Sequence, residues 1–399
     1  MQGNRRSNIA CIESVIYVFS YTMSLEIGFI LLLSVLFICY CSLNFLIVKG
    51  LKKLLFLQQA SSQEKPQISI IVAARNEEAN IGRCLQSLVQ QNYPVGLFEI
   101  VIADDRSTDG TAAIVRNYQL RYPYIKLVTV NRISSDLPPK KNALNEAMKE
   151  SRFDILAFTD ADCVAPSIWL SSIAKEFLPE VGVVAGYCPI EQRFPRTFVA
   201  RWSDFFLRYL EIKKWVGAAA GVGLGYAYLS SGGNLAYRKS VFREVNGYEK
   251  IKHSLSGDDD LFIQLIQKET RWKIRYMISR ESSVETAPPP SMVYFINQQR
   301  RHFSAAAYYP LRMKIVFGLM HSYNALAVLF IFAFPSIGIA ALTAKFIIDS
   351  AIFYKGSALF GNTGLRGSVV PLELASVIYN SIIGPLGFLG TISWKGSKS

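Results

Sequence analysis

The segment DILAFTDADC at residues 154–163 joins a short apolar run to two carboxylates that stand one residue apart. The run predicts a buried strand over residues 154–159, and Pro166 opens the segment that follows. Alternate side chains of an extended backbone point the same way, so Asp160 and Asp162 can both reach one cation. Paired carboxylate oxygens suit Mg²⁺ or Mn²⁺. The alternative for so common a tripeptide is a solvated turn, and the rest of the chain has to decide between the two.

Strands and helices are predicted to alternate on the N-terminal side of this segment. Expected strands cover residues 68–73, 98–103 and 125–130, and expected helices cover residues 76–91, 111–121 and 140–150. Such alternation indicates an α/β fold with a mostly parallel sheet and right-handed connections through covering helices. The carboxyl ends of the strands then share one edge, which is where open α/β sheets bind ligands.

Two more loops at this edge carry acidic side chains. Residues 74–78 follow the first strand and include Glu77, and residues 104–110 follow the second and begin with Asp104 and Asp105. Each loop taken alone is also explained by helix capping, because acids favour the positive end of the helix dipole. Three acidic loops on one edge are harder to explain in that way. The pattern therefore predicts a site for a charged ligand.

Composition indicates a membrane protein. The 399 residues are 51% hydrophobic, and residues 25–48 contain one charge, Glu26, at the edge of the run. That length crosses a bilayer, and no small-residue cleavage site follows it, so we expect an anchor rather than a signal peptide. Lys49, Lys52 and Lys53 after it place the next domain in the cytoplasm, beneath the plasma or inner membrane.

Charge and cysteine content exclude two other classes. The net charge of +13 is dispersed and gathers beside apolar segments, which favours membrane flanks over a nucleic-acid partner. The six cysteines form no Cys-x-x-Cys pair, so neither a disulfide framework nor a zinc site is indicated.

We expect five regions along the chain. They are an N-terminal segment (1–24), a transmembrane anchor (25–48), a linker (49–65), a catalytic domain (66–310) and a C-terminal membrane region (311–399). Whether Met1 or Met23 is the true start is left open by the sequence.

The C-terminal region is expected to contain two or three transmembrane helices. Residues 315–334 and 369–392 are span candidates. Residues 337–354 carry Lys345 and Asp349 one helical turn apart. These two residues either pair inside a helix bundle or lie along the membrane interface.

Several motifs in order resemble the family 2 glycosyltransferases, inverting enzymes with the nucleotide-sugar-binding GT-A fold. The matching segments are residues 73–77 (AARNE), 104–111 (DDRSTDGT), 141–145 (KNALN), 159–162 (TDAD), 232–238 (GGNLAYR), 256–261 (SGDDDL) and 298–302 (QQRRH). The resemblance covers residues 66–310 and implies a GT-A domain, a nucleotide-sugar donor, most simply a UDP-sugar, and Mg²⁺ or Mn²⁺.

The resemblance also implies roles for individual residues. In the donor site, Asp104 or Asp105 would hold the base and ribose, with Ala74 and Glu77 lining the same pocket and Lys141 near the nucleotide. Asp160 and Asp162 would hold the divalent ion on the diphosphate. From the QQRRH segment, Gln298 would line the donor site and Arg301 would help to bind the leaving diphosphate.

The base that deprotonates the acceptor hydroxyl is expected in the segment SGDDDL. The family has a Glu-Asp pair here, and the three acids of this chain leave two registers, so we take Asp258 as the base and Asp259 as the alternative. His302 replaces the family's Trp, which removes a large stacking surface from the acceptor side. That departure leaves processive polymer synthesis in doubt.

The resulting hypothesis is a membrane-bound inverting glycosyltransferase acting on a membrane lipid or a lipid-linked glycan. A basic, aromatic helix over residues 194–216 either lies in the headgroup plane or packs on the catalytic domain. The first alternative function is a processive polysaccharide synthase resembling hyaluronan, chitin or cellulose synthases. The second is a non-catalytic membrane scaffold. The sequence leaves the sugar, the acceptor and the oligomeric state open.

Overall fold

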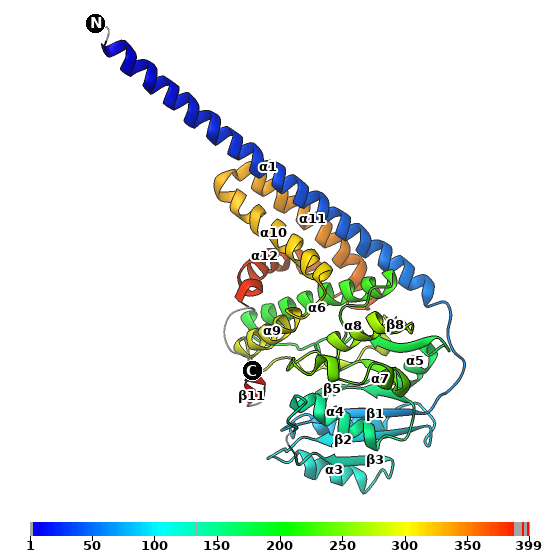
Figure 1. Ribbon diagram of the computed structural model, residues 1–399. Coiled ribbons are helices and arrows are strands. Elements are labelled where there is room, and N and C mark those ends of the chain that lie inside the picture. Colours follow the sequence, from blue (N-terminus) through cyan, green and yellow to red (C-terminus); the bar gives the residue numbers. More distant parts are fainter. Residues whose placement is uncertain (1–2, 133, 387–392, 395–396, 399) are drawn as a thin grey trace.

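The computed structural model describes residues 3–132, 134–386, 393–394 and 397–398 (Figure 1). Long helices from both ends of the chain lie together, and an α/β unit lies beneath them. Helices α6 (Phe198–Leu224) and α9 (Met292–Ala306) lie between these two parts.

The main sheet has seven strands in the order β3-β2-β1-β4-β7-β6-β8. Strands β1 to β4 are mutually parallel, β6 and β8 are parallel to each other, and β7 is antiparallel to both β4 and β6. The strands are β1 (Ile68–Ala74), β2 (Phe98–Asp104), β3 (Ile125–Thr129), β4 (Ile155–Phe158), β6 (Val181–Gly186), β7 (Leu235–Arg238) and β8 (Lys273–Met277). The predicted mostly parallel α/β sheet is confirmed, and the first four strands agree with the predicted ranges to within one residue at each end.

The helices of the α/β unit cover this sheet. They are α2 (Ile81–Val89), α3 (Thr111–Gln119), α4 (Pro139–Glu150), α5 (Trp169–Glu176), α7 (Lys239–Glu244) and α8 (Asp260–Glu269), with short 3-10 turns η1 (Glu249–Ile251) and η2 (Arg280–Ser282). A small antiparallel pair, β5 (Cys163–Val164) and β9 (Glu285–Thr286), lies beside the end of β4. Strands β1 and β2 are buried along nearly their whole length, as expected for strands covered on both faces.

One predicted helix begins later than expected. The prediction covered residues 76–91, but α2 starts at Ile81. Asn76 has φ of 54°, a left-handed conformation that cannot continue a right-handed helix. The backbone amides of Asn76, Glu77 and Glu78 donate instead to side chains in the loop between β2 and α3 and at the start of α3.

Within the described residues, three helices are long and apolar enough to cross a membrane: Glu26–Leu57 in α1 (Gly3–Leu57), α10 (Leu311–Ala333) and α11 (Pro335–Leu359). Helix α12 (Val369–Leu386) follows the turn η3 (Arg366–Ser368). Residues 387–392 of the predicted span over 369–392 lie outside the described residues. The last described elements are the short strands β10 (Ser393–Trp394) and β11 (Ser397–Lys398).

Helix α1 extends beyond both ends of the predicted anchor. The linker expected from residue 49 is helical as far as Leu57, because Leu51 and Leu54 are buried in the core and hold this last part of α1 against the protein. Lys345 and Asp349 form an ion pair inside the bundle, which settles the alternative that the sequence left open for residues 337–354.

Candidate active site

The loops after β1 and β2 are joined by hydrogen bonds at the predicted edge of the sheet. The Thr108 amide donates to the Asn76 side chain at 2.8 Å, and the Gly110 amide donates to the Glu78 carboxylate at 2.7 Å. The Asp105 amide donates to the Ala74 carbonyl at 2.8 Å. The two acidic loops that the sequence placed on one edge therefore do meet.

Asp104 and Asp105 lie on this edge, at the carboxyl end of β2, and both are nearly fully buried. Asp105 forms ion pairs with Arg106 at 2.8 Å and with Arg75 at 3.6 Å. Asp104 accepts a long bond of 3.4 Å from the Ser107 amide. Asp104 therefore keeps more of its acceptor capacity for a ligand than Asp105 does.

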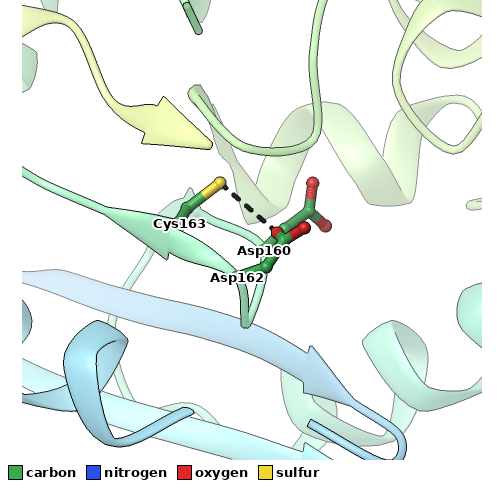
Figure 2. A group of neighbouring side chains, drawn as sticks. All are labelled: Asp160, Asp162 and Cys163. Atoms are coloured by element: carbon green, nitrogen blue, oxygen red, sulfur yellow. Dashed lines mark hydrogen bonds between the residues drawn. The ribbon is translucent and has the colours of Figure 1, made fainter. Parts of the chain in front are cut away.

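Asp160 and Asp162 extend from the carboxyl end of β4, beside Cys163 (Figure 2). One ligand atom from each of the three residues lies within 4.8 Å of the others. Burial raises the pKa of Asp162 to about 7, with further contributions from the Asp160 and Glu77 carboxylates. Mutual repulsion of this kind is relieved by a bound dication.

The donor set at this position fits Mg²⁺ or Mn²⁺. Two carboxylates provide hard oxygen ligands, and the buried Thr159 hydroxyl on the wall of the adjoining pocket has no hydrogen-bond partner among the described residues. Hydrogen bonding to Cys188, together with burial, raises the pKa of the Cys163 thiol. A neutral thiol is a poor ligand for these ions, so the set consists of Asp160 and Asp162.

Lys140, at the start of α4, joins the end of β4 to the segment before α8. Its ammonium lies 3.0 Å from Asp160 and 3.0 Å from Asp258. Burial opposes its charge, but the two carboxylates raise the Lys140 pKa well above its ordinary value. These three side chains and Gly232 line one pocket at the ends of the strands.

The three consecutive acids before α8 have different surroundings. Asp259 accepts from the amides of Gly232 at 2.9 Å and Asp260 at 2.7 Å, so it caps α8 and fixes the Gly232 loop. Asp260 accepts from the Tyr309 hydroxyl, and burial beside Asp259 raises its pKa to about 8. Only Asp258 of the three lines the pocket.

The electrostatic surroundings keep Asp258 ionised. Burial favours its neutral form, but the neighbouring Lys140 ammonium more than compensates, and the Asp258 pKa is lowered. A buried carboxylate that stays charged at neutral pH can accept a proton from a hydroxyl group. This geometry favours Asp258 over Asp259 as the base.

Lys141 does not face the pocket. Its ammonium donates to the carbonyls of Ile251, Ser254 and Ser256 at 2.6–2.9 Å, and the residue is fully buried. All three of its donors are thus used by the loop that precedes Asp258. The sequence analysis missed Lys140, because adjacent helical lysines point about 100° apart and nothing in their order tells which one faces the ligand.

Helix α9 brings the QQRRH segment toward the same pocket. Gln298 and Arg301 are partly buried on it, whereas His302 is exposed. His302 lies close enough to the pocket for the charges of Lys140 and Asp258 to act on it. The structure thus brings the loops after β1 and β2, the carboxylates of Asp160 and Asp162, Asp258 and α9 to one edge of the sheet.

This arrangement has the GT-A fold of glycosyltransferases. The mannosyltransferase PcManGT from Pyrobaculum calidifontis, solved in complex with GDP-Man and Mn²⁺, has the same fold at a TM-score of 0.51. The two sequences are 20% identical, and the superposition covers 87% of this chain and 98% of that chain. Residues 69–245 match glycosyl transferase family 2. This match assigns residues 69–245 to a glycosyl transferase family 2 domain.

Proteins similar in sequence to this chain have different activities. The beta-monoglucosyldiacylglycerol synthase of Synechocystis sp. is 29% identical over 231 residues, which cover 57% of this chain and 46% of that protein. Its namesake from Nostoc sp. is 38% identical over 120 residues, covering 30% of this chain and 25% of that protein. A poly-beta-1,6-N-acetyl-D-glucosamine synthase of Staphylococcus epidermidis is 32% identical over 138 residues, covering 33% and 31%. The matches span less than half the length of these relatives.

Proposed function

We propose that this protein is a membrane-bound inverting enzyme that moves a sugar from a UDP-sugar to a hydroxyl group of a membrane lipid or a lipid-linked glycan. The observation that carries the proposal is the Lys140 ammonium, held 3.0 Å from both Asp160 and Asp258. It fixes the expected metal-binding end of the donor site beside the expected base. An acceptor hydroxyl bound between them would face the anomeric carbon from the side of the base.

In the proposed reaction Asp258 accepts the proton of the acceptor hydroxyl as its oxygen attacks the anomeric carbon. The bond to the nucleotide diphosphate breaks in the same step, which inverts the anomeric centre. A carboxylate base of this kind contributes about 10²–10⁴ in rate. Mg²⁺ or Mn²⁺ on Asp160 and Asp162 would neutralise charge on the leaving diphosphate. Arg301 from α9 would contribute a guanidinium to the same charge.

A lipid acceptor is supported by the surroundings of the site. Three helices can cross a membrane, and α6 and α9 lie between these helices and the sheet (Figure 1). At the start of α6, Phe194, Phe198 and Val199 are 74–85% exposed. The exposed Arg193, Arg196 and Arg201 alternate with them. Apolar and basic side chains in this mixture suit a lipid headgroup region.

The topology that follows is a multi-pass protein with its catalytic domain, residues 66–310, on the cytosolic side of the plasma or inner membrane. The lysines after the first span support this orientation. Nucleotide sugars would then reach the site from the cytosol, and the acceptor would enter from the membrane.

Labelled donor transfer tests the proposal. Membranes that contain the protein are incubated with a panel of radiolabelled UDP-sugars and Mn²⁺ or Mg²⁺, and the products are partitioned between organic and aqueous phases. We expect label in the organic phase, on a lipid with one or a few added sugars. Label in a long aqueous polymer would favour a polysaccharide synthase instead, and incorporation without added divalent cation would contradict the metal site.

A further inference from the structure

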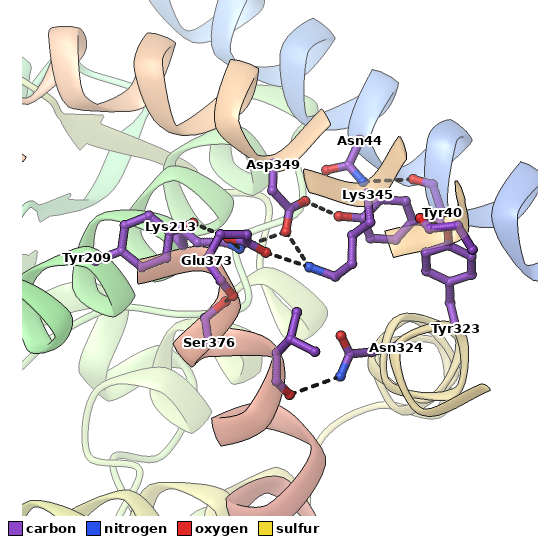
Figure 3. A network of polar contacts seen from close by, with 12 residues as sticks. Tyr40, Asn44, Tyr209, Lys213, Tyr323, Asn324, Lys345, Asp349, Glu373 and Ser376 are labelled. Carbon is purple, nitrogen blue, oxygen red and sulfur yellow. Dashed lines mark hydrogen bonds and ion pairs between the residues drawn. The ribbon is translucent and has the colours of Figure 1, made fainter. Parts of the chain in front are cut away.

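A cluster of charged side chains lies where α6 meets the C-terminal helices (Figure 3). Lys345 of α11 pairs with Asp349, one turn along the same helix, at 2.6 Å and with Glu373 of α12 at 2.7 Å. Lys213 of α6 pairs with the same two acids at 2.8 and 2.9 Å. We call Lys213, Lys345, Asp349 and Glu373 the membrane charge cluster.

Two hydroxyl groups complete the cluster. Tyr209 of α6 donates to Glu373, and Tyr40 of α1 donates to Asp349. The Tyr40 ring in turn stacks on Tyr323 of α10, with centroids 5.0 Å apart. The cluster therefore joins α6 to every membrane-side helix of the described structure. None of its residues belongs to the pocket that holds Asp160 and Asp258.

Residues along the membrane-facing side of α6 also contact α1 and α11. Tyr209, Lys213, Val216, Ala220 and Gly223 follow at intervals of three or four residues, so they share one face. A methyl group on Gly223 would overlap the carbonyl oxygen of Gly50 in α1. A methyl group on Gly356 of α11 would overlap the side chain of Val216. Close backbone approach thus holds the second half of α6 against α1 and α11.

The end of α6 leads directly into the catalytic pocket. The helix stops at Gly225, where φ is 80°, and the Tyr226 amide returns to the Gly221 carbonyl at 2.7 Å. Tyr228 then packs against α6, where Gly217 and Gly221 leave room for its ring. The same loop continues to Gly232, which lines the pocket and is held by Asp259.

We infer that the membrane charge cluster positions α6 and, through α6, the loop 226–234 on the acceptor side of the pocket. Sugar transfer then requires the membrane helices, whereas nucleotide binding does not. The inference rests on the proposed function. The cluster residues are positioning residues, because they touch neither the pocket nor its acids. The loops expected to bind the nucleotide follow β1 and β2, whereas α6 contacts β8 at the other end of the sheet.

The charge balance of the cluster gives the inference a sharp test. Its two lysines and two acids cancel, so removing one partner leaves a buried charge without compensation. Removing one lysine and one acid together restores the balance. Lys345→Met and Glu373→Gln are therefore compared, singly and combined, in the full chain reconstituted in nanodiscs. Lys355→Met is the matched control, because Lys355 is an exposed lysine on the same helix.

Each single variant is expected to lower kcat for transfer to the lipid acceptor by about 10- to 100-fold, as a small misplacement of reacting groups does. The KM for the UDP-sugar and the Kd for UDP with Mn²⁺ should change by less than about twofold. The double variant should recover most of the lost kcat, and Lys355→Met should behave as the unaltered protein. If Lys345→Met is too unstable to assay, Lys213→Met replaces it, with Lys213→Arg as the conservative rescue.

Wild-type kcat in both single variants would overturn the inference. So would a parallel loss of UDP binding and transfer, since that reports general damage rather than positioning of the acceptor side. Failure of the unaltered protein to transfer sugar, while it still binds UDP, is a different result and would count against the proposed function itself.

Discussion

The pocket at the ends of the strands and the bundle of membrane-side helices contain the same local arrangement, one lysine between two carboxylates. Lys140 bridges Asp160 and Asp258, and Lys345 bridges Asp349 and Glu373. The surroundings of the two lysines differ in charge. Asp162 and Asp259 add carboxylates near Lys140, whereas Lys213 balances the acids near Lys345. The first region therefore has more acids than cations, and the second has equal numbers of both.

This difference distinguishes a binding site from a structural cluster. Carboxylates without a matching cation repel one another and destabilise the ligand-free protein, and a bound dication removes this repulsion. A balanced cluster gains nothing from a ligand and acts by holding its elements in place. Substitutions that change the charge count should therefore affect ligand binding and turnover in the pocket, and helix positioning in the membrane region.

The largest effect is expected for Asp258→Asn. An amide cannot accept the acceptor proton, so kcat should fall by about 10²–10⁴ while UDP binding stays nearly unchanged. Single-turnover transfer and titration with UDP measure the two quantities. Asp259→Asn is the matched control, because an asparagine still caps α8. Loss of turnover in Asp259→Asn with activity retained in Asp258→Asn would reverse the assignment of the base.

Asp162→Asn should act on the donor instead. It removes one of two carboxylates from the expected metal site, and we expect the metal-dependent part of UDP affinity to fall about 100-fold, which corresponds to about 2.7 kcal/mol. Calorimetric titration of UDP with and without Mn²⁺ measures this part. Asp154→Asn, at the other end of β4, is the control. Identical Mn²⁺ dependence in the variant and the unaltered protein would exclude Asp162 as a ligand.

Lys141→Met tests a lysine with a third kind of surroundings, since Lys141 bonds only carbonyl groups. The change leaves three buried acceptors without their donor and should lower the free energy of unfolding by about 2 kcal/mol. The catalytic constants of the folded protein should stay within about threefold. Thermal unfolding measures the loss, and the exposed Lys149→Met on the same helix should leave it unchanged. A specific loss of UDP affinity in Lys141→Met would return this residue to the donor site.

The predictable parts of the molecule are those that depend on local pattern. Buried apolar runs identified β1 to β4, and the acids that follow them were correctly placed on one edge, because parallel strands bring their carboxyl ends together. Lys345 and Asp349 were recognised as possible partners for the same reason, since they stand one helical turn apart.

The parts that sequence reasoning missed depend on contacts between distant segments. Nothing near Lys140 in the sequence indicates Asp258, and nothing near Glu373 indicates Lys213 or Tyr209. The role of α6 was left open between an interface helix and a packed helix. Its membrane-facing side is defined by Gly50 and Gly356 on two other helices, which no property of α6 itself discloses.

The smallest effect, and the most direct test of the charge comparison, is expected for Lys140→Met. Lys140 lowers the Asp258 pKa against the effect of burial, so without it this pKa should rise and part of the base should be protonated at neutral pH. Loss of one charge-assisted contact of about 1.5 kcal/mol should lower kcat about tenfold. The acidic limb of the kcat profile should move to higher pH, and activity should recover as the pH is raised.

The concentration of Mn²⁺ needed for half-maximal activity should fall in the same variant, because the ammonium no longer competes with the ion for Asp160. Lys149→Met, at an exposed position of the same helix, should change neither the pH profile nor the Mn²⁺ requirement. A lower kcat with an unchanged pH profile and an unchanged Mn²⁺ requirement would mean that Lys140 is a structural bridge like Lys345, and the distinction between the two regions would not hold.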